Sequence, residues 1–337
     1  MSVLTGTPPP ALRDGWLAAL ADLVPVADGY RDEVVGRGEA LDLLRCGDAL
    51  LDDLVAHGLP CSPDGRFDRY DLFNLALYSG SGRSAPETGI RFALRWMGRE
   101  PDTWFTDKSW TISVELACPR AGGCGADPWW KAARPLPEAF GGTVHTLLPD
   151  DPGTADLDTP GFTARLTARG ERRELRSPVL REICAEYDAA RWVRLPVELQ
   201  ARPELVLPHG IAPCISVSLD LAAKCRAAGY RARTRRGWIL GMLDLAHAWL
   251  EVVDDDGLTK VVDPVFGLLS AHADAPHPSF RAACSGSRFN RLLPSAHEAD
   301  EPLFRHGCAG GEHTPKTRTT VRTARPDGPA DHGKETP

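Results

Sequence analysis

Three residues of the chain have the types and the order of an activated thiol: Cys214, His247 and Asp263. A cysteine thiol is a weak nucleophile near pH 7, because its ordinary pKa is about 8.5. A nearby imidazole and the exposed N–H groups of a helix start both favour the thiolate. A carboxylate that accepts the other ring N–H would fix the tautomer and orientation of the imidazole. Such a group could attack a carbonyl carbon, with the backbone N–H of Cys214 donating to the oxyanion.

This chemistry requires Cys214 to stand at the start of a helix. Small and apolar residues recur at three- and four-residue intervals from 214 to 228, which predicts one face of a largely buried helix. Pro213 suits the entry to this helix, since its fixed φ and missing N–H cost nothing in the first turn. Gly229 suits its end.

His247 and Asp263 are expected on two neighbouring strands. The segment 245–253 alternates in the manner of a strand, "DDDG" at 254–257 predicts a turn, and Pro264 ends the return strand. A hairpin centred near residue 255 would place His247 opposite Asp263. The carboxylate would then lie within reach of the imidazole.

The segment 208–266 resembles the transglutaminase-like cysteine enzymes. That family has a cysteine on a helix, then G-x-x-A-R, then a strand with H-A-W-x-E-V, then D-P. The matching residues are Cys214, "GYRAR" at 229–233, "HAWLEV" at 247–252 and "DP" at 263–264. The resemblance implies that Cys214 is the nucleophile, His247 the general base and Asp263 the orienting group. It also implies that catalysis requires no metal and no organic cofactor.

The fold expected from this resemblance is α+β. A papain/transglutaminase-like catalytic domain at 161–306 would pack the cysteine helix on an antiparallel sheet. Helical periodicity at 38–58 and 88–98 predicts a mostly helical N-terminal domain or extension over 1–150. Residues 307–337 have almost no apolar content, which predicts a disordered tail.

The resemblance implies acyl transfer through a cysteinyl thioester, with amide formation as in bacterial natural-product pathways. The partners would be an acyl donor (a peptide, an amide or a carrier-bound thioester) and an amine acceptor, one of which the N-terminal region is expected to bind. A cysteine peptidase or amidohydrolase with the same triad is the alternative, because residues 214–229 are also similar to lasso-peptide leader peptidases. A non-catalytic binding module on the same scaffold is the second alternative.

The charge and apolar content of the chain limit the kinds of partner and compartment that are expected. The chain has 39 basic and 46 acidic residues and a formal net charge of −7, so neither nucleic acid nor an anionic membrane is expected as a partner. No apolar run is long enough to span a bilayer. The N-terminal segment lacks a basic start and an uninterrupted apolar stretch, which favours a cytoplasmic protein. In a reducing compartment most of the nine cysteines are expected to be thiols.

Other residues could take part in such a site. Cys225 shares the helical stripe of Cys214 and is interpreted as a buried structural thiol. His209 is interpreted as a loop histidine, and Glu251 as a solvated or hairpin-paired carboxylate. The motifs identify no side-chain donor to an oxyanion, for which Trp192 and Gln200 are the candidates.

Cys118 and Cys124 could supply two thiolates to zinc, with Cys184 or His145 as companions. Zinc-binding cysteine pairs usually have two to four residues between them. This pair has five, "PRAGG", and no second pair matches it. The favoured interpretation is a loop with incidental cysteines.

Overall fold

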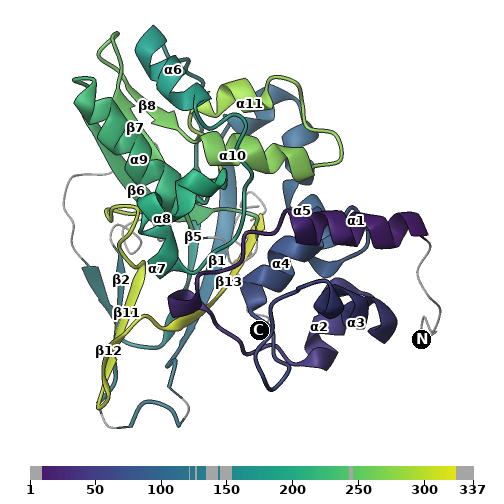
Figure 1. Ribbon diagram of the computed structural model, residues 1–337. Coiled ribbons are helices and arrows are strands. Elements are labelled where there is room, and N and C mark those ends of the chain that lie inside the picture. Colours follow the sequence, from purple (N-terminus) through teal and green to yellow (C-terminus); the bar gives the residue numbers. More distant parts are fainter. Residues whose placement is uncertain are drawn as a thin grey trace, which may run out of the picture. The chain divides into compact units, whose positions relative to one another are not determined.

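The computed structural model describes residues 10–120, 122–125, 127–133, 143–144, 154–242 and 246–323 (Figure 1). These residues form helices and mainly antiparallel sheets, which confirms the predicted mixed fold class of helix and sheet. The chain divides into two compact units. Unit 1 consists of 1–99, 184–220 and 264–282, and unit 2 of 100–183, 221–263 and 283–337.

Four helices of unit 1 share one apolar core, to which Trp16, Leu51 and Leu72 contribute. These helices are α1 (Pro10–Ala21), α2 (Arg37–Leu44), α3 (Asp48–Ala56) and α4 (Arg69–Tyr78), and α5 (Ala85–Leu94) packs against α2 and α4 (Figure 1). Side-chain caps fix two of the helix starts. Asp68 accepts backbone N–H bonds at the start of α4, and Ser84 forms a capping box with Glu87 at the start of α5.

The chain before Cys214 is anchored in this unit. The Asn74 side chain on α4 exchanges two hydrogen bonds of 2.8 Å with the backbone of Arg194. Val26, Leu199 and four further apolar residues form a second core around the segment 193–211. The elements of this part of unit 1 are α7 (Val197–Gln200), α8 (Pro203–Val206), η4 (Leu207–His209) and the start of α9 (Cys214–Ala227).

Unit 2 contains a five-stranded sheet of order β10-β6-β7-β8-β9. Its members are β6 (Ala232–Ile239), β7 (Ala246–Val253), β8 (Thr259–Val262), β9 (Ser285–Gly286) and β10 (Leu292–Pro294). The strand β7 lies between β6 and β8, and six of its eight residues are buried. A central strand therefore carries His247, and all its pairings are antiparallel.

Two further sheets of unit 2 have the orders β13-β1-β5-β3 and β12-β11-β2-β4. Trp110 on β1, Trp130 on β2, Trp238 on β6 and Phe304 on β11 belong to one apolar core. The strands are β1 (Lys108–Ala117), β2 (Trp129–Ala133), β3 (Thr143–Val144), β4 (Thr154–Leu157), β5 (Gly161–Ala168), β11 (Phe304–Cys308), β12 (Gly311–His313) and β13 (Lys316–Thr323).

The predicted disordered tail at 307–337 is corrected for 307–323, which lie largely in β11, β12 and β13. Composition misled the prediction because β13, "KTRTTVRT", has few apolar residues. Its eight residues pair with β1 from Trp110↔Thr323 to Ala117↔Lys316. Backbone pairing with a long neighbour holds such a strand without much apolar burial. Residues 324–337 lie outside the described part of the chain.

The predicted domains at 1–150 and 161–306 also differ from the two units. Strands β1 and β2 fall within the expected helical region, yet Trp110 and Trp130 lie in the core of unit 2. Unit 1 in turn takes in the later segments 184–220 and 264–282. Periodicity read along a sequence shows which segments are helical, but not which distant segments share a core.

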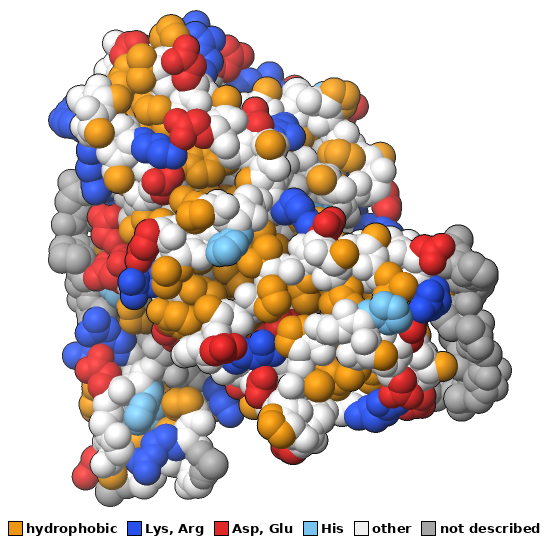
Figure 2. Space-filling view, viewed as in Figure 1, with side chains coloured by type: hydrophobic (Ala, Val, Ile, Leu, Met, Phe, Trp, Pro, Cys, Tyr) orange, Lys and Arg blue, Asp and Glu red, His pale blue; other side chains and the backbone are white. Residues whose placement is uncertain are grey.

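Among the described residues, no helix has the length and apolar content needed to cross a membrane. Figure 2 shows acidic and basic side chains interspersed over the face in view.

Candidate functional site

Helix α9 begins at Cys214 and ends at Ala227, which confirms the predicted helix. Gly229 follows with a φ of +89°, a conformation that glycine adopts without strain. The Val217 N–H donates to the Pro213 carbonyl at 3.1 Å, so Pro213 stands at the helix entry as expected. Cys214 is 9 % exposed and lies in the first turn, where the dipole of the helix favours a thiolate.

Gln200 contacts this thiol directly. The Cys214 Sγ donates to Gln200 Oε1 at 3.8 Å, and the Ile215 N–H donates to the same oxygen at 3.5 Å. Gln200 Nε2 donates to the Leu195 carbonyl at 2.7 Å, while the Ser216 hydroxyl donates to the Gln200 carbonyl at 2.6 Å. Gln200 therefore ties α7 to the start of α9 and presents its oxygen to the sulfur. In this orientation the amide oxygen of Gln200, and not its NH₂ group, contacts the sulfur.

We predict that Gln200→Glu slows alkylation of Cys214 by iodoacetamide at pH 7 by about tenfold, because a carboxylate next to sulfur disfavours the thiolate. The alkylation rate plotted against pH should move to higher pH. Gln200→Ala is the matched variant, which removes the same contacts without adding charge and should move the profile less. Profiles of both variants that coincide with the profile of the unaltered chain would show that Gln200 does not influence the thiol.

Trp192, the other candidate for an oxyanion donor, packs in the interior of unit 1. Its ring makes edge contacts with Phe73 and His272, and its carbonyl accepts a 2.6 Å hydrogen bond from the Tyr78 hydroxyl. These contacts describe a packing role.

His247 and Asp263 form a buried pair in unit 2. His247 Nε2 lies 2.6 Å from Asp263 Oδ2, and the two residues are 3 % and 2 % exposed. Because a carboxylate oxygen accepts, Nε2–H is the donor, and Nδ1 is then the nitrogen that can take up a proton. The Asp263 N–H donates to the Cys284 carbonyl at 3.0 Å, which fixes the backbone that carries the carboxylate. The sequence prediction that the carboxylate reaches the imidazole holds.

The register between these strands differs from the prediction. Leu250 pairs with Val262, so residue 263 lies level with residue 249 and diagonal to His247. The turn is centred one residue later than expected, at 256. A shift of this kind moves a partner by two positions and keeps it on the same face of the sheet. Diagonal neighbours on one face are within reach of such side chains.

Glu251, four residues further along β7 than His247, is buried and not solvated. Its Oε2 accepts from Arg233 Nε at 2.9 Å and from Arg235 Nε at 2.8 Å. Burial raises the pKa of Glu251 to about 7, although the Arg233 guanidinium acts in the opposite direction. These contacts identify Glu251 as a strand-paired carboxylate that holds β6 against β7.

Cys225 and His209, two further candidates for catalytic residues, lie in surroundings that do not suit catalysis. Cys225 is buried on α9, and burial raises the pKa of its thiol to about 11. Such a thiol is unreactive near pH 7. His209 is exposed at the end of η4. Neither has the environment of a catalytic group.

The structure thus brings together His247 and Asp263, which both belong to unit 2. Cys214 and Gln200 belong to unit 1, and α9 passes from unit 1 into unit 2 after Asp220. The joint action of Cys214 with His247 is part of the function proposed below.

No protein-family model matches the chain. No curated protein matches it either. Among solved structures, a candidate cysteine protease from Cytophaga hutchinsonii is similar with a TM-score of 0.36 and 10 % identity over 66 % of this chain and 92 % of the other. A similarity at this level does not establish a shared fold.

Proposed function

We propose that the chain is a thiol-dependent acyltransferase in which Cys214 is the nucleophile, His247 the general base and Asp263 the group that orients the base. The observation that carries this proposal is the buried 2.6 Å pair of His247 and Asp263. A buried imidazole whose Nε2–H is held by a carboxylate keeps its other nitrogen for proton transfer. Cys214 adds a thiol in the first turn of a helix.

The reaction begins with transfer of the Cys214 proton to His247 Nδ1. The thiolate attacks the carbonyl carbon of the donor, and the backbone N–H of Cys214 donates to the oxyanion. The imidazolium then protonates the leaving group, and a cysteinyl thioester remains. An amine attacks this thioester while His247 accepts its proton, so that an amide forms and the thiol is regenerated. Asp263 stabilises the imidazolium in both halves of the cycle.

Burial of the reacting groups supports transfer to an amine over transfer to water. Less than one tenth of the surface is exposed in each of the three residues, Cys214, His247 and Asp263. Water at high concentration competes for any thioester, and a transferase must limit its access while it holds the amine in place. Hydrolysis by the same triad remains the second candidate, because both reactions share the acyl-enzyme. The donor is thus a peptide, amide or carrier-bound thioester, and the acceptor an amine.

Intact-mass spectrometry of the full chain tests this proposal. The protein is incubated with a panel of small acyl thioesters and glutamine-containing peptides, and acylated protein is digested to locate the modified residue. We expect one acyl group on Cys214, released as an amide after addition of a primary amine. Cys61→Ser, which alters an exposed thiol, is the control and should acylate normally.

Three outcomes are decisive. Acylation of a cysteine other than Cys214, or failure of iodoacetamide to react faster at Cys214 than at Cys225, would exclude the assigned nucleophile. Release of free acid alone, whichever amine is supplied, would replace the transferase with the hydrolase.

A further inference from the structure

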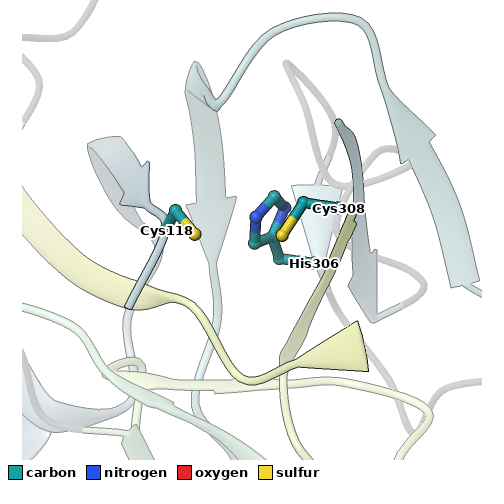
Figure 3. Close-up of side chains that lie close together, drawn as sticks. All are labelled: Cys118, His306 and Cys308. Atoms are coloured by element: carbon teal, nitrogen blue, oxygen red, sulfur yellow. The ribbon is translucent and has the colours of Figure 1, made fainter. Parts of the chain in front are cut away.

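A second group of sulfur and nitrogen ligands lies in unit 2. The sequence suggested Cys184 or His145 as companions for Cys118. Cys184 belongs to unit 1, and His145 lies outside the described residues. The structure instead places His306 and Cys308 beside Cys118, and the ligand atoms of these three side chains lie within 4.8 Å of one another (Figure 3).

Paired strands hold these side chains in place. Cys118 directly follows β1, while His306 and Cys308 lie two residues apart on β11 and therefore on one face. β11 pairs with β2 on one side and with β12 on the other. Figure 3 shows the three side chains pointing toward one another.

His306 has its tautomer fixed for binding a ligand. Its Nδ1 lies 3.0 Å from the Trp129 carbonyl and must donate to it, which leaves the lone pair on Nε2. The ring is fully buried and stacks on Trp130, with centroids 3.8 Å apart. Metal-binding histidines commonly have such a backbone partner on the second ring nitrogen.

Cys124 completes the group. Its Sγ lies 3.5 Å from His306 Nε2. A zinc ion with Zn–S near 2.3 Å and Zn–N near 2.05 Å in a tetrahedron separates a sulfur from a nitrogen by about 3.6 Å. The observed separation is close to that edge, which suits coordination of one zinc ion by both atoms.

We propose that Cys118, Cys124, His306 and Cys308 bind one zinc ion in a tetrahedral structural site. Three thiols and one imidazole make a Cys₃His set, which zinc prefers over harder cations. Binding releases the three thiol protons and involves no oxidation. With four protein ligands no position is left open, and the ion would act by tying the 118–124 loop to the β11–β12 hairpin.

The surroundings suit the charge of such a site. Three thiolates and Zn²⁺ carry a net charge of −1, and the Gly310 N–H and the Arg120 guanidinium both lie against the Cys308 sulfur. Arg120 also occupies the space that a side chain at position 310 would fill, since a Cβ there would lie 1.7 Å from Arg120 Nη1. Hydrogen bonds of this kind to sulfur stabilise thiolate ligands.

Metal analysis of the full chain, expressed with zinc and purified under reducing conditions without chelators, tests the site. We expect about one zinc per chain, and a fall to below about 0.2 in Cys308→Ser and in His306→Ala. Cys61→Ser, which changes an exposed cysteine in unit 1, should retain the full zinc content. Circular dichroism reports whether each variant folds.

A second measurement keeps the proposal testable if the variants unfold. Cobalt added to the reduced, zinc-free chain should give the intense d–d absorption of a tetrahedral site and a thiolate-to-cobalt charge-transfer band. Zinc below about 0.1 per chain in the unaltered protein, with no such spectrum, would overturn the site. A disulfide between any two of Cys118, Cys124 and Cys308 in the native, purified chain would overturn it as well.

Discussion

Replacement of Cys214 by alanine is expected to lower turnover by at least about 10⁴-fold, to the level of the uncatalysed reaction. The acyl-enzyme cannot form without the sulfur, and no neighbouring group in the first turn of α9 can replace it. Only one sulfur atom is lost from a small side chain, so the free energy of unfolding should change by about 1 kcal/mol. Steady-state rates and thermal unfolding of the same preparations measure both effects.

Cys225→Ala is the matched control for this variant. It removes a buried thiol from the same helix, so its effect on stability should be similar while its turnover stays within about threefold. A Cys214→Ala enzyme that keeps a tenth or more of its activity would exclude Cys214 as the nucleophile.

Asp263→Asn is expected to reduce kcat by about 10²- to 10⁴-fold. Asparagine keeps the shape of the side chain, but it removes the charge that stabilises the imidazolium and no longer imposes the Nε2–H tautomer. The loss should appear in both acylation and release of the acyl group, since His247 carries a proton in each. Single-turnover kinetics with an acyl thioester separate the two steps.

Glu251→Gln distinguishes this effect from the loss of any buried carboxylate in the same sheet. Glu251 lies on the strand of His247 and pairs with two arginines. Its replacement should therefore lower the melting temperature while kcat changes little. A loss of kcat below about threefold in Asp263→Asn would show that another group orients His247.

Local patterns predicted the parts of the site that are close in sequence. The helix from Cys214 and the strands of His247 and Asp263 follow from periodicity, turn residues and one proline. The hairpin register was one turn position off, yet the pair still meets because a two-residue shift keeps both side chains on the same face. The side-chain partner of the thiol, Gln200, could only be left open, since no periodicity links α7 to α9.

Pairing between distant segments was the part that the sequence did not reveal. Cys124 and His306 are 182 positions apart, and a cysteine spacing rule examines only neighbouring residues. Strand β13 was predicted to be disordered because polar composition says nothing of a partner strand elsewhere in the chain.

The alternation of the chain between the two units has a consequence for its biogenesis. Unit 1 is assembled from 1–99, 184–220 and 264–282, so its last segment leaves the ribosome long after its first. At 5–20 residues per second, the helices α1–α5 wait roughly 10–40 s for residues up to 282. In the first part of that interval, until residues 193–199 have emerged, the apolar surface that packs against Val193, Leu195 and Leu199 is exposed. The yield of folded protein during expression should therefore depend strongly on holding chaperones and on temperature, even if the finished fold is stable.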